Sequence, residues 1–597
     1  MVCSSLIVFL VAAAPAQART SLREMARAAD PRDVWVLRET LREASPQERA
    51  EAAFALGQYG LFEVPEGGAE PVDIASARAA AAEVLAPEAS NPDAGVRRAV
   101  VEALGKVGAD GEETVLLAAT TDADAEVRAQ AALALFRMRF LKRVPEYSTA
   151  AASKLSLLTA DPEAEVRWRA AYAATHWAEP RMAKALAVCA RDADPRVRLF
   201  SVRALGKLGA APEDSLLVDP DPYVRAEAVG ALRAAKAWSR LSNSLFVDAS
   251  AHVRAAAADA AAASDDVARF GPLLEEMAAG TGTLAEGRAL LALAKLRGEG
   301  AAEVLARARK NPRWWVRARA FEASASLLRA GEILQEGTKD PDPRVAAQAL
   351  ETLAVSTFTY ALPALAQVLR DPRAPLELRG TAVDAAAQRQ DAQLLGGLFE
   401  SMKSATGTGA GEMRESIRKA LLTLADKHPD QAASIRAALK GFAPFTDKPR
   451  RVRPLKDAPL VDMETEKGSF TIALSSAADA GTHAAAFAES VKKGFYDGLT
   501  WHRVVTAFVV QGGDPRGSGW GDAGWRLADE VNRTPFLRGT VGMPKAGKDT
   551  GGCQLFVSLV ATPHLDGRYT AFGRVISGLE VLDRLEPGDR ILRASLK

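Results

Sequence analysis

The sequence predicts a multidomain protein in which an all-α solenoid is followed by a mainly-β closed barrel with two helices. Three observations lead to this prediction. One phrase recurs about every 30 residues over most of the chain. A basic, proline-rich stretch then interrupts it, and short β-type runs replace the helical spacing after residue 457. The chain has 597 residues, too many for one hydrophobic core, so several domains are expected.

The composition is that of an ordinary globular protein. Hydrophobic residues make up 48%, charged residues make up 25%, and the formal net charge is +1. So small a net charge gives no general attraction to nucleic acid or anionic membranes, although a local patch could still bind one. Nucleic acid is not expected as a partner. No cysteine or histidine cluster suggests a metal, and we expect no metal and no cofactor. Cys189 and Cys553 are expected to be buried or idle thiols.

Residues 1–18 predict a secretory signal peptide. Residues 6–11 form an apolar run, and Ala16-Gln17-Ala18 is a small-x-small cleavage site. The run is too short for a membrane span. No Lys or Arg precedes it, so an uncleaved signal that anchors the protein is the alternative. We expect an exported protein, periplasmic or secreted, without a stable membrane span.

Residues 19–440 repeat a phrase in which Asp or Asn, often with proline, precedes Val-Arg. The Asp or Asn side chain can cap a helix, and proline is tolerated at the first helical position. Apolar residues follow at helical spacing, and a second apolar stretch separates successive copies. Each unit is therefore predicted to be a helical pair, and the array a solenoid. Clear copies are Val96-Arg97, Val127-Arg128, Val166-Arg167, Val197-Arg198, Val224-Arg225 and Val316-Arg317.

The repeated phrase resembles the HEAT-repeat family in its short bacterial form, over roughly residues 30–440. The resemblance implies a concave surface that binds a protein partner. The arginine after each valine is predicted to pair with a loop Asp of an adjacent unit, although it could instead face a ligand. Trp314-Trp315 is predicted to pack between units, with an exposed binding hot spot as the alternative.

Residues 441–456 interrupt the repeat and predict an extended, basic linker. Pro444, Pro449 and Pro454 alternate with lysine and arginine. The basic cluster could touch an anionic surface, but a solvated linker is the preferred interpretation.

Residues 457–597 predict a closed antiparallel barrel. Helices are expected at residues 482–493 and 578–585. One strand is expected from Val504 to Val510, with Gly512-Gly513-Asp514 after it as a turn. The other expected strands are residues 458–464, 469–474, 539–543, 555–558, 572–575 and 591–594.

Three stretches of this region resemble the cyclophilin family in its bacterial form. They are residues 494–515, with Trp501-His502-Arg503-Val504 and Gln511-Gly512-Gly513-Asp514, residues 554–557, and residues 564–575. The resemblance spans the whole domain, and the motifs come in the family's order. The resemblance implies that the domain is an eight-stranded barrel. It also implies a peptidyl-prolyl cis-trans isomerase that acts on proline-containing polypeptides during protein folding.

The implied reaction needs neither a nucleophile nor a general base, because no bond to the substrate forms. The barrier of ~18–20 kcal/mol comes from amide resonance, so a group that favours the twisted amide is sufficient. Arg503 matches the family's catalytic arginine, and a guanidinium can donate to the proline nitrogen as it becomes pyramidal. A salt bridge within the barrel is the alternative role of Arg503, and His502 is expected to be structural.

The same resemblance implies a substrate-binding set around Arg503. Its apolar members would line the pocket for the proline ring, and its two glutamines would hold the substrate backbone. Ala546 lies where the family's backbone contacts the residue before proline, next to Pro544 and Lys545, which depart from the usual residues. At residue 564 many eukaryotic members have a tryptophan associated with cyclosporin binding. The set is Phe508, Val509, Gln511, Ala546, Gln554, Phe556, His564 and Leu565.

Two functions are compatible with these features. The first is an exported isomerase whose solenoid recruits client or partner proteins. The second is a non-catalytic scaffold whose barrel only binds proline-containing segments. The presence of Arg503, Phe508, Gln511 and Phe556 favours the first.

Overall fold

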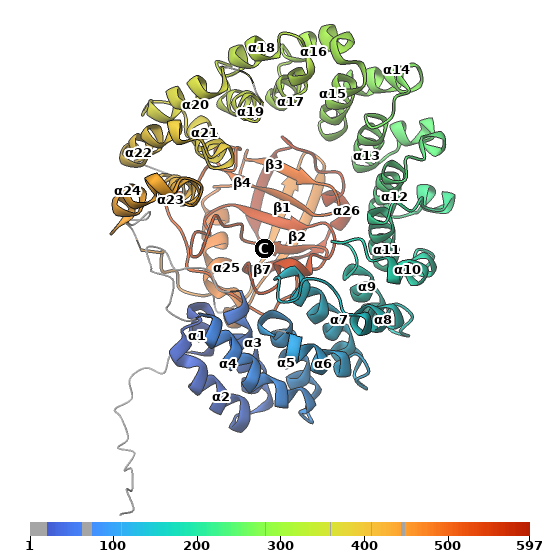
Figure 1. The fold of residues 1–597 in the computed structure, drawn as a ribbon, viewed down its shortest axis with the longest axis vertical. Helices are drawn as coiled ribbons and strands as arrows, with labels where there is room; N and C mark the ends of the chain where they lie inside the picture. Colours follow the sequence, from blue (N-terminus) through green and yellow to red (C-terminus); the bar gives the residue numbers. More distant parts are fainter. Residues whose placement is uncertain are drawn as a thin grey trace, which may run out of the picture.

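The computed structural model describes residues 21–61, 74–108, 110–280, 282–356, 358, 360–406, 409–442, 448–455 and 457–597. The predicted signal peptide lies outside the described residues. The predicted fold class is confirmed, because helices occupy the chain up to residue 439 and an eight-stranded sheet follows. Figure 1 shows the helices as an open ring around the sheet.

One layer of helices lines the inside of the ring, and its successive members pack side by side. The repeated phrase begins many of them, since Asp93, Asp124, Asp194 and Asp221 accept hydrogen bonds from first-turn N–H groups. The layer consists of α3 (Pro46–Gly57), α5 (Ala94–Val107), α7 (Ala125–Phe140), α9 (Ala164–Tyr172), α11 (Pro195–Lys207), α12 (Pro222–Ala234), α13 (Ala251–Ala261), α15 (Leu284–Arg297), α17 (Trp314–Ala323), α19 (Pro343–Ala354), α21 (Leu376–Arg389) and α23 (Ala410–Lys427).

A second layer covers the outside of the ring (Figure 1). Between α11 and α13 the short 3-10 turns η5 (Asp214–Val218) and η7 (Asn243–Val247) take the place of outer helices. Within the described ranges, none of the helices combines the length and the apolar character needed to cross a membrane. The outer helices, preceded by α1 (Leu22–Ala28), are α2 (Val34–Glu43), α4 (Ile74–Leu85), α6 (Asp110–Ala119), α8 (Thr149–Leu158), α10 (Ala183–Cys189), α14 (Val267–Ala278), α16 (Ala302–Ala308), α18 (Ala330–Gly337), α20 (Ala361–Arg370), α22 (Leu395–Ser404) and α24 (Pro429–Leu439).

In the six clear copies, the arginine after the valine pairs with an Asp of the next unit, as predicted. In the weaker copy Val253-Arg254, the described hydrogen bonds of Arg254 reach only carbonyl oxygens of its own loop. Nε and Nη2 of Arg128 donate to the two oxygens of Asp161 at 2.7 and 3.0 Å. Nη1 of Arg128 also donates to the carbonyl oxygen of Asp122 in its own loop, at 2.9 Å. Two-pronged pairs fix orientation as well as distance, so they set the angle between units. The other pairs are Arg97–Asp122, Arg167–Asp192, Arg198–Asp219, Arg225–Asp248 and Arg317–Asp340.

The sheet inside the ring is a closed antiparallel barrel with the strand order β3-β4-β6-β5-β7-β2-β1-β8. Its edges meet where Gly498 N donates to Ile591 O at 2.7 Å and Ile591 N donates to Leu499 O at 2.8 Å. The strands are β1 (Leu460–Thr465), β2 (Gly468–Leu474), β3 (Thr500–Val505), β4 (Val509–Asp514), β5 (Thr540–Gly542), β6 (Leu555–Ser558), β7 (Ala571–Ser577) and β8 (Ile591–Leu596).

The expectation of one strand from Val504 to Val510 is wrong. Two strands, β3 and β4, meet at a tight turn in which Phe508 N donates to Val505 O at 3.1 Å and Ala507 has a φ of 51°. Residues 512–514, expected as a turn, form the end of β4. Alanine is not a turn-forming residue, and β-branched residues lie on both sides of it, so composition alone suggested a continuous strand.

Two helices accompany the barrel, as expected. Helix α25 (Ala477–Lys492) begins before the expected start, with a break at Ala480, and α26 (Leu579–Leu582) is a single short turn. Trp501 and Phe470 are fully buried in the barrel. One apolar cluster joins this core to that of the N-terminal repeats, so barrel and ring pack as one body.

The described part of the segment between ring and barrel, residues 448–455, has no regular secondary structure. Arg450 forms an ion pair with Glu489, and its N–H donates to the carbonyl oxygen of Arg526 at 2.7 Å. Val452 is buried. This part therefore contacts the barrel at Arg450 and Val452, while Lys448, Arg451 and Arg453 are exposed to solvent.

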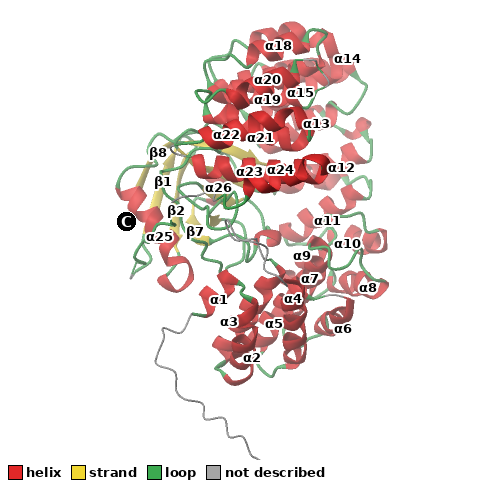
Figure 2. Ribbon diagram, turned by 60° about the vertical axis from the view of Figure 1, so that its left-hand side comes forward, coloured by secondary structure: helices red, strands yellow, loops and turns green. Residues whose placement is uncertain are grey.

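The inner helices also bind the barrel through polar contacts. Arg137 of α7 lies 3.1 Å from Asp566, and the Tyr223 hydroxyl of α12 donates to Asp583 at 2.7 Å. On the other side of the ring, Glu377 of α21 accepts from Arg516 at 2.6 Å. Figure 2 shows the strands within the curve of the helical array, so the barrel is enclosed by the repeats that precede it in sequence.

Candidate active site

Three adjacent strands place the candidate residues side by side. Arg503 of β3 lies opposite Gln511 of β4, and Gln511 lies opposite Phe556 of β6. Residues paired across strands share one face of a sheet. Their neighbours Val504 and Val510 are buried in the core on the other face. Strand alternation therefore places a cation, an amide and a ring together on the outside of the barrel.

A chain of hydrogen bonds links Arg503 to the two glutamines. Nη1 of Arg503 lies 3.5 Å from Oε1 of Gln511, at the limit of hydrogen bonding. Nε2 of Gln511 donates to Oε1 of Gln554 at 3.0 Å. Gln554 in turn donates to the carbonyl oxygens of Gly519 and Gly521 at 2.9 and 3.0 Å. These bonds fix the orientation of both amides before any ligand binds.

Arg503 has no carboxylate partner among the described residues. Its contacts are Gln511 and the Phe508 ring, whose centroid lies 5.9 Å from the guanidinium carbon. The side chain is exposed at the mouth of a cleft, but the cleft walls remove part of its water shell. This desolvation lowers the pKa of Arg503, and nearby Tyr569 opposes the shift. Arginine stays charged at any working pH, so the site holds a positive charge that no carboxylate of the described residues neutralises.

An apolar wall stands next to this cation. Val509, Phe556 and Leu565 are buried and Phe508 is half-buried. The rings of Phe508 and His564 stack with centroids 5.5 Å apart. The wall forms its own cluster, separate from the barrel core, and consists of Val509, Phe536, Phe556, Leu565 and Ala571 with Phe508 and Tyr569 packed against them.

Phe536 and Gly542 belong to this wall, although the sequence did not indicate them. Phe536 stacks on Phe556 with ring centroids 5.4 Å apart. A Cβ at Gly542 of β5 would lie 2.3 Å from Cζ of Phe556 and 2.6 Å from Cε1 of Phe536. Only glycine fits beneath the two rings. A glycine inside a strand run was the available signal, and such a glycine often marks close approach of another group.

His564 joins the wall to the ring of helices. Its Nδ1 lies 2.8 Å from the Tyr172 hydroxyl oxygen of α9, and the rings of Phe140 and His176 are nearby. Burial lowers the pKa of His564 to about 3, and the neighbouring His176 and Arg568 act in the same direction. The imidazole is therefore neutral and forms part of an apolar, hydrogen-bonded contact.

Two further inner helices hold the turn between β3 and β4. Arg203 of α11 donates to the carbonyl oxygen of Ala507 at 3.2 Å, and His252 Nδ1 of α13 lies 3.0 Å from Thr506 Oγ1. Nothing in the repeat sequence pointed to these contacts. They join residues 304 and 254 positions apart, so no local pattern could reveal them.

Ala546 is the one candidate that the described contacts do not join to this network. It lies in the loop after β5, where its N–H donates to Thr550 Oγ1 at 2.9 Å. Its carbonyl oxygen accepts from Lys419 Nζ of α23 at 2.8 Å. A solenoid side chain therefore binds the backbone of the residue that the family resemblance places in substrate contact.

The cysteines give no sign of redox or metal chemistry. Cys189 and Cys553 are free and buried. Burial raises the pKa of both thiols, which disfavours the reactive thiolate. In the part of the chain that the structure describes, no group of three or more His, Cys, Asp or Glu residues is arranged to hold a metal.

Comparisons with known proteins match both parts of the chain. The family described as "Cyclophilin type peptidyl-prolyl cis-trans isomerase/CLD" matches residues 460–594, and HEAT repeats match residues 34–136 and 152–216. A peptidyl-prolyl cis-trans isomerase of Synechococcus elongatus is 43% identical over 136 residues, covering 22% of this chain and 93% of the relative. One of Helicobacter pylori is 44% identical over 133 residues, covering 22% and 81%.

A solved structure is also similar. It is a cyclophilin type peptidyl-prolyl cis-trans isomerase from Cryptosporidium parvum, with 25% sequence identity and a TM-score of 0.23, covering 24% of this chain and 98% of that chain. Residues 460–594, which match the cyclophilin-type family, reach into all eight strands and include Arg503, Gln511, Gln554 and the apolar wall. The chain therefore belongs to the cyclophilin-type peptidyl-prolyl cis-trans isomerases and joins such a domain to N-terminal HEAT repeats.

Proposed function

We propose that the protein isomerises the peptide bond before proline in polypeptide substrates, with Arg503 as its catalytic residue. One observation carries the proposal: a guanidinium without a carboxylate partner among the described residues stands beside the apolar wall of Phe508 and Phe556. The uncatalysed exchange takes tens to hundreds of seconds and can limit folding. A catalyst therefore only has to favour the twisted amide.

Arg503 acts on the state in which amide resonance is lost. As the C–N bond rotates, the proline nitrogen becomes pyramidal and exposes a lone pair, to which the Arg503 N–H donates. This bond is stronger in the twisted state than in the planar one, so it lowers the barrier. Phe508, Phe556 and Leu565 hold the proline ring. Gln511 and Gln554 hold the flanking backbone, so that rotation is confined to one bond.

The direct test is a proline-peptide isomerisation assay on the full chain and its Arg503→Ala variant. Loss of one preorganised donor is expected to lower kcat/KM by about 100-fold or more, with thermal unfolding unchanged. Arg574→Ala is the matched control, because Arg574 is an exposed arginine on β7 of the same barrel. Equal inactivity of the wild type and Arg503→Ala would instead support the scaffold that only binds proline-containing segments.

We propose further that the HEAT repeats recruit the client. The support is that inner helices border the site, with Tyr172, Arg203 and His252 in contact with its residues. A photo-crosslinker at Gln348, in an inner-face cavity, should capture an unfolded client. One at Leu157, exposed on outer helix α8, should not. Equal capture at both positions, or none at Gln348, would contradict recruitment by the inner face.

Export is a proposal that depends on residues 1–18. Fractionation of bacteria that express the full chain, followed by N-terminal sequencing, tests it. A periplasmic or secreted product that begins at Arg19 supports cleavage, and an intact chain in the membrane fraction supports the uncleaved anchor. An intact cytosolic product contradicts both.

A further inference from the structure

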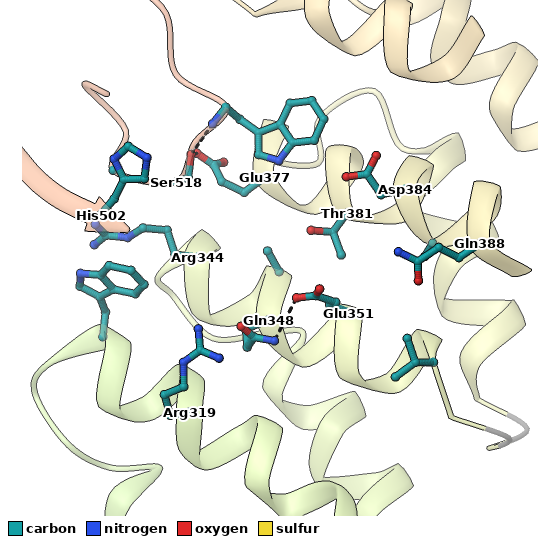
Figure 3. A pocket seen from close by; sticks show the side chains of 16 residues that line it. Arg319, Arg344, Gln348, Glu351, Glu377, Thr381, Asp384, Gln388, His502 and Ser518 are labelled. Carbon is teal, nitrogen blue, oxygen red and sulfur yellow. Dashed lines mark hydrogen bonds between the residues drawn. The ribbon is translucent and has the colours of Figure 1, made fainter. Parts of the chain in front are cut away.

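A cleft lined by ring and barrel together begins at Arg503. One cavity of about 200 Å³ lies between β3 and helices α15, α17 and α19. A second of about 340 Å³ adjoins it and continues between α19, α21 and the loop after β4 (Figure 3). Together they have the size of a ligand site, about 300–1,000 Å³. The residues common to both walls are Trp314, Arg319, Arg344, Gln348 and His502.

The cavity beside Arg503 is lined by cations. Arg288, Arg319 and Arg344 share its wall with Arg503, and none of the described residues that line it is Asp or Glu. Outside the wall, Arg344 pairs with Asp342 at 2.7 Å, and Arg319 pairs with Glu322. Nη1 of Arg288 lies 3.8 Å from Asp259, beyond hydrogen-bond reach. A cavity lined by one sign of charge raises the local concentration of oppositely charged ligands.

His502 is an independent sign that a ligand belongs in this cleft. Its ring lies in the wall between the two cavities, and both ring nitrogens are buried without a hydrogen-bond partner among the described residues. Burial lowers the pKa of His502 to about 4, so the neutral ring offers one donor and one acceptor. A buried polar group without a hydrogen-bond partner is destabilising. A bound peptide would supply such a partner to the His502 ring.

Glycines and interdomain contacts fix the shape of the cavity. A Cβ at Gly287 of α15 would lie 2.9 Å from Cγ of Arg319, so glycine lets this arginine cross the helix. At Gly517 a Cβ would lie 3.0 Å from Nη1 of Arg344. On another side, Leu284 N donates to the Glu586 carboxylate at 3.2 Å. The cavity therefore exists only because the repeats pack on the barrel.

We propose that this cavity is a specificity subsite of the isomerase, which accepts the carboxylate side chain of an Asp or Glu within one or two residues of the proline. The inference rests on the proposed function, because it places the subsite beside Arg503. Guanidinium groups bind carboxylates with two parallel hydrogen bonds. Farther along the cleft, Glu351 of α19 and Asp384 of α21 line the second cavity (Figure 3), so a basic residue beyond the acidic one matches that cavity.

The test uses the full chain and short proline peptides that differ only in Glu against Gln, placed one or two residues before or after the proline. Binding is measured by fluorescence anisotropy and turnover by the isomerisation assay. In at least one placement the Glu peptide should bind about tenfold more tightly than the Gln peptide, as expected for one charge-assisted hydrogen bond. The ratio of the two dissociation constants is therefore the measured quantity. Arg288→Gln should bring this ratio towards one, through KM and not kcat.

Arg307→Gln is the matched control, because it removes the same charge from an exposed position on the outer helix α16. It should keep the wild-type ratio. A ratio of one at every placement, or an unchanged ratio in Arg288→Gln, overturns the subsite. Turnover without a Glu preference overturns the subsite and leaves the isomerase function standing. A Glu preference in binding without turnover supports the subsite and refutes the isomerase function.

Discussion

The arginines of the repeats and Arg503 of the barrel put the same side chain to opposite uses. In the six clear copies of the repeat, the arginine lies 2.7–3.1 Å from an Asp of the next unit, with its side chain 14–18% exposed. Arg503 is exposed, and its one described hydrogen bond, to Gln511, is 3.5 Å long. A guanidinium that is already satisfied orients its neighbours, whereas an unsatisfied one is available to a substrate. The partners of an arginine thus separate the structural role in the repeats from the catalytic role proposed for Arg503.

Lysine at Arg503 should give the largest effect. Arg503→Lys keeps the charge but loses the planar set of donors, and we expect kcat/KM to fall by about 100-fold without a change in Tm. Arg128→Lys is the counterpart in the repeats and should lower Tm without lowering kcat/KM. Full activity in Arg503→Lys would show that a single charged donor is sufficient and that the planar guanidinium is not required.

Truncation of a repeat arginine tests the other side of the comparison. Arg128→Ala removes two of the three described donors to the Asp161 carboxylate, whose side chain is 7% exposed, and leaves only the N–H of Glu163. We expect the free energy of unfolding to fall by about 2–4 kcal/mol, measured by chemical denaturation, with kcat/KM unchanged. Arg307→Ala, at an exposed pair, should have almost no effect on stability. An unchanged unfolding midpoint in Arg128→Ala would mean that the Arg–Asp pairs between units do not stabilise the array.

Arg203 combines features of the repeat arginines and of Arg503. It pairs with Glu227 at 2.8 Å, and it also donates to the turn that carries Phe508. Arg203→Ala should loosen that turn and lower kcat/KM by about threefold to tenfold, mainly through KM. Arg203→Lys should recover part of the loss. Wild-type kinetics in Arg203→Ala would show that the turn holds its position without the repeats.

The smallest effect is expected from pH, at the contact between His564 and Tyr172. Burial lowers the pKa of His564 to about 3, from 6.5 in the unfolded chain. Between these values the unfolded state binds a proton that the folded state does not. The stability that the neutral, buried His564 gives to the folded state is therefore fully present above pH 6.5. It is lost as pH falls, by at most about 1.4 kcal/mol per pH unit.

His564→Gln removes this contribution. Its Tm should fall less steeply than that of the wild type when the pH is lowered from about 7 to about 5, as measured by thermal unfolding. Parallel curves for the two proteins would contradict a neutral, buried imidazole at this contact.

Local sequence determined the repeat, its ladder and the core of the site. Each Arg–Asp pair joins residues in adjacent units, as Arg198 and Asp219 do 21 positions apart, and the repeated phrase encodes both partners. Arg503 and Gln511 lie 8 positions apart on neighbouring strands, so the motif brings them together once the hairpin forms. Even here the turn at Ala507 was not predicted, because the β-branched residues on both sides of it are typical of a continuous strand.

Tertiary structure alone decided that the ring closes around the barrel and completes the cleft. The contact between Tyr172 and His564 spans 392 positions, and the arginines beside Arg503 come from three different inner helices. The curvature of a solenoid is the sum of small rotations between units, so no single repeat specifies where its inner face will meet another domain. The summed rotations place Arg288 and Arg319 at the cavity that Arg503 lines. The surroundings of the proposed proline site therefore depend on the whole chain.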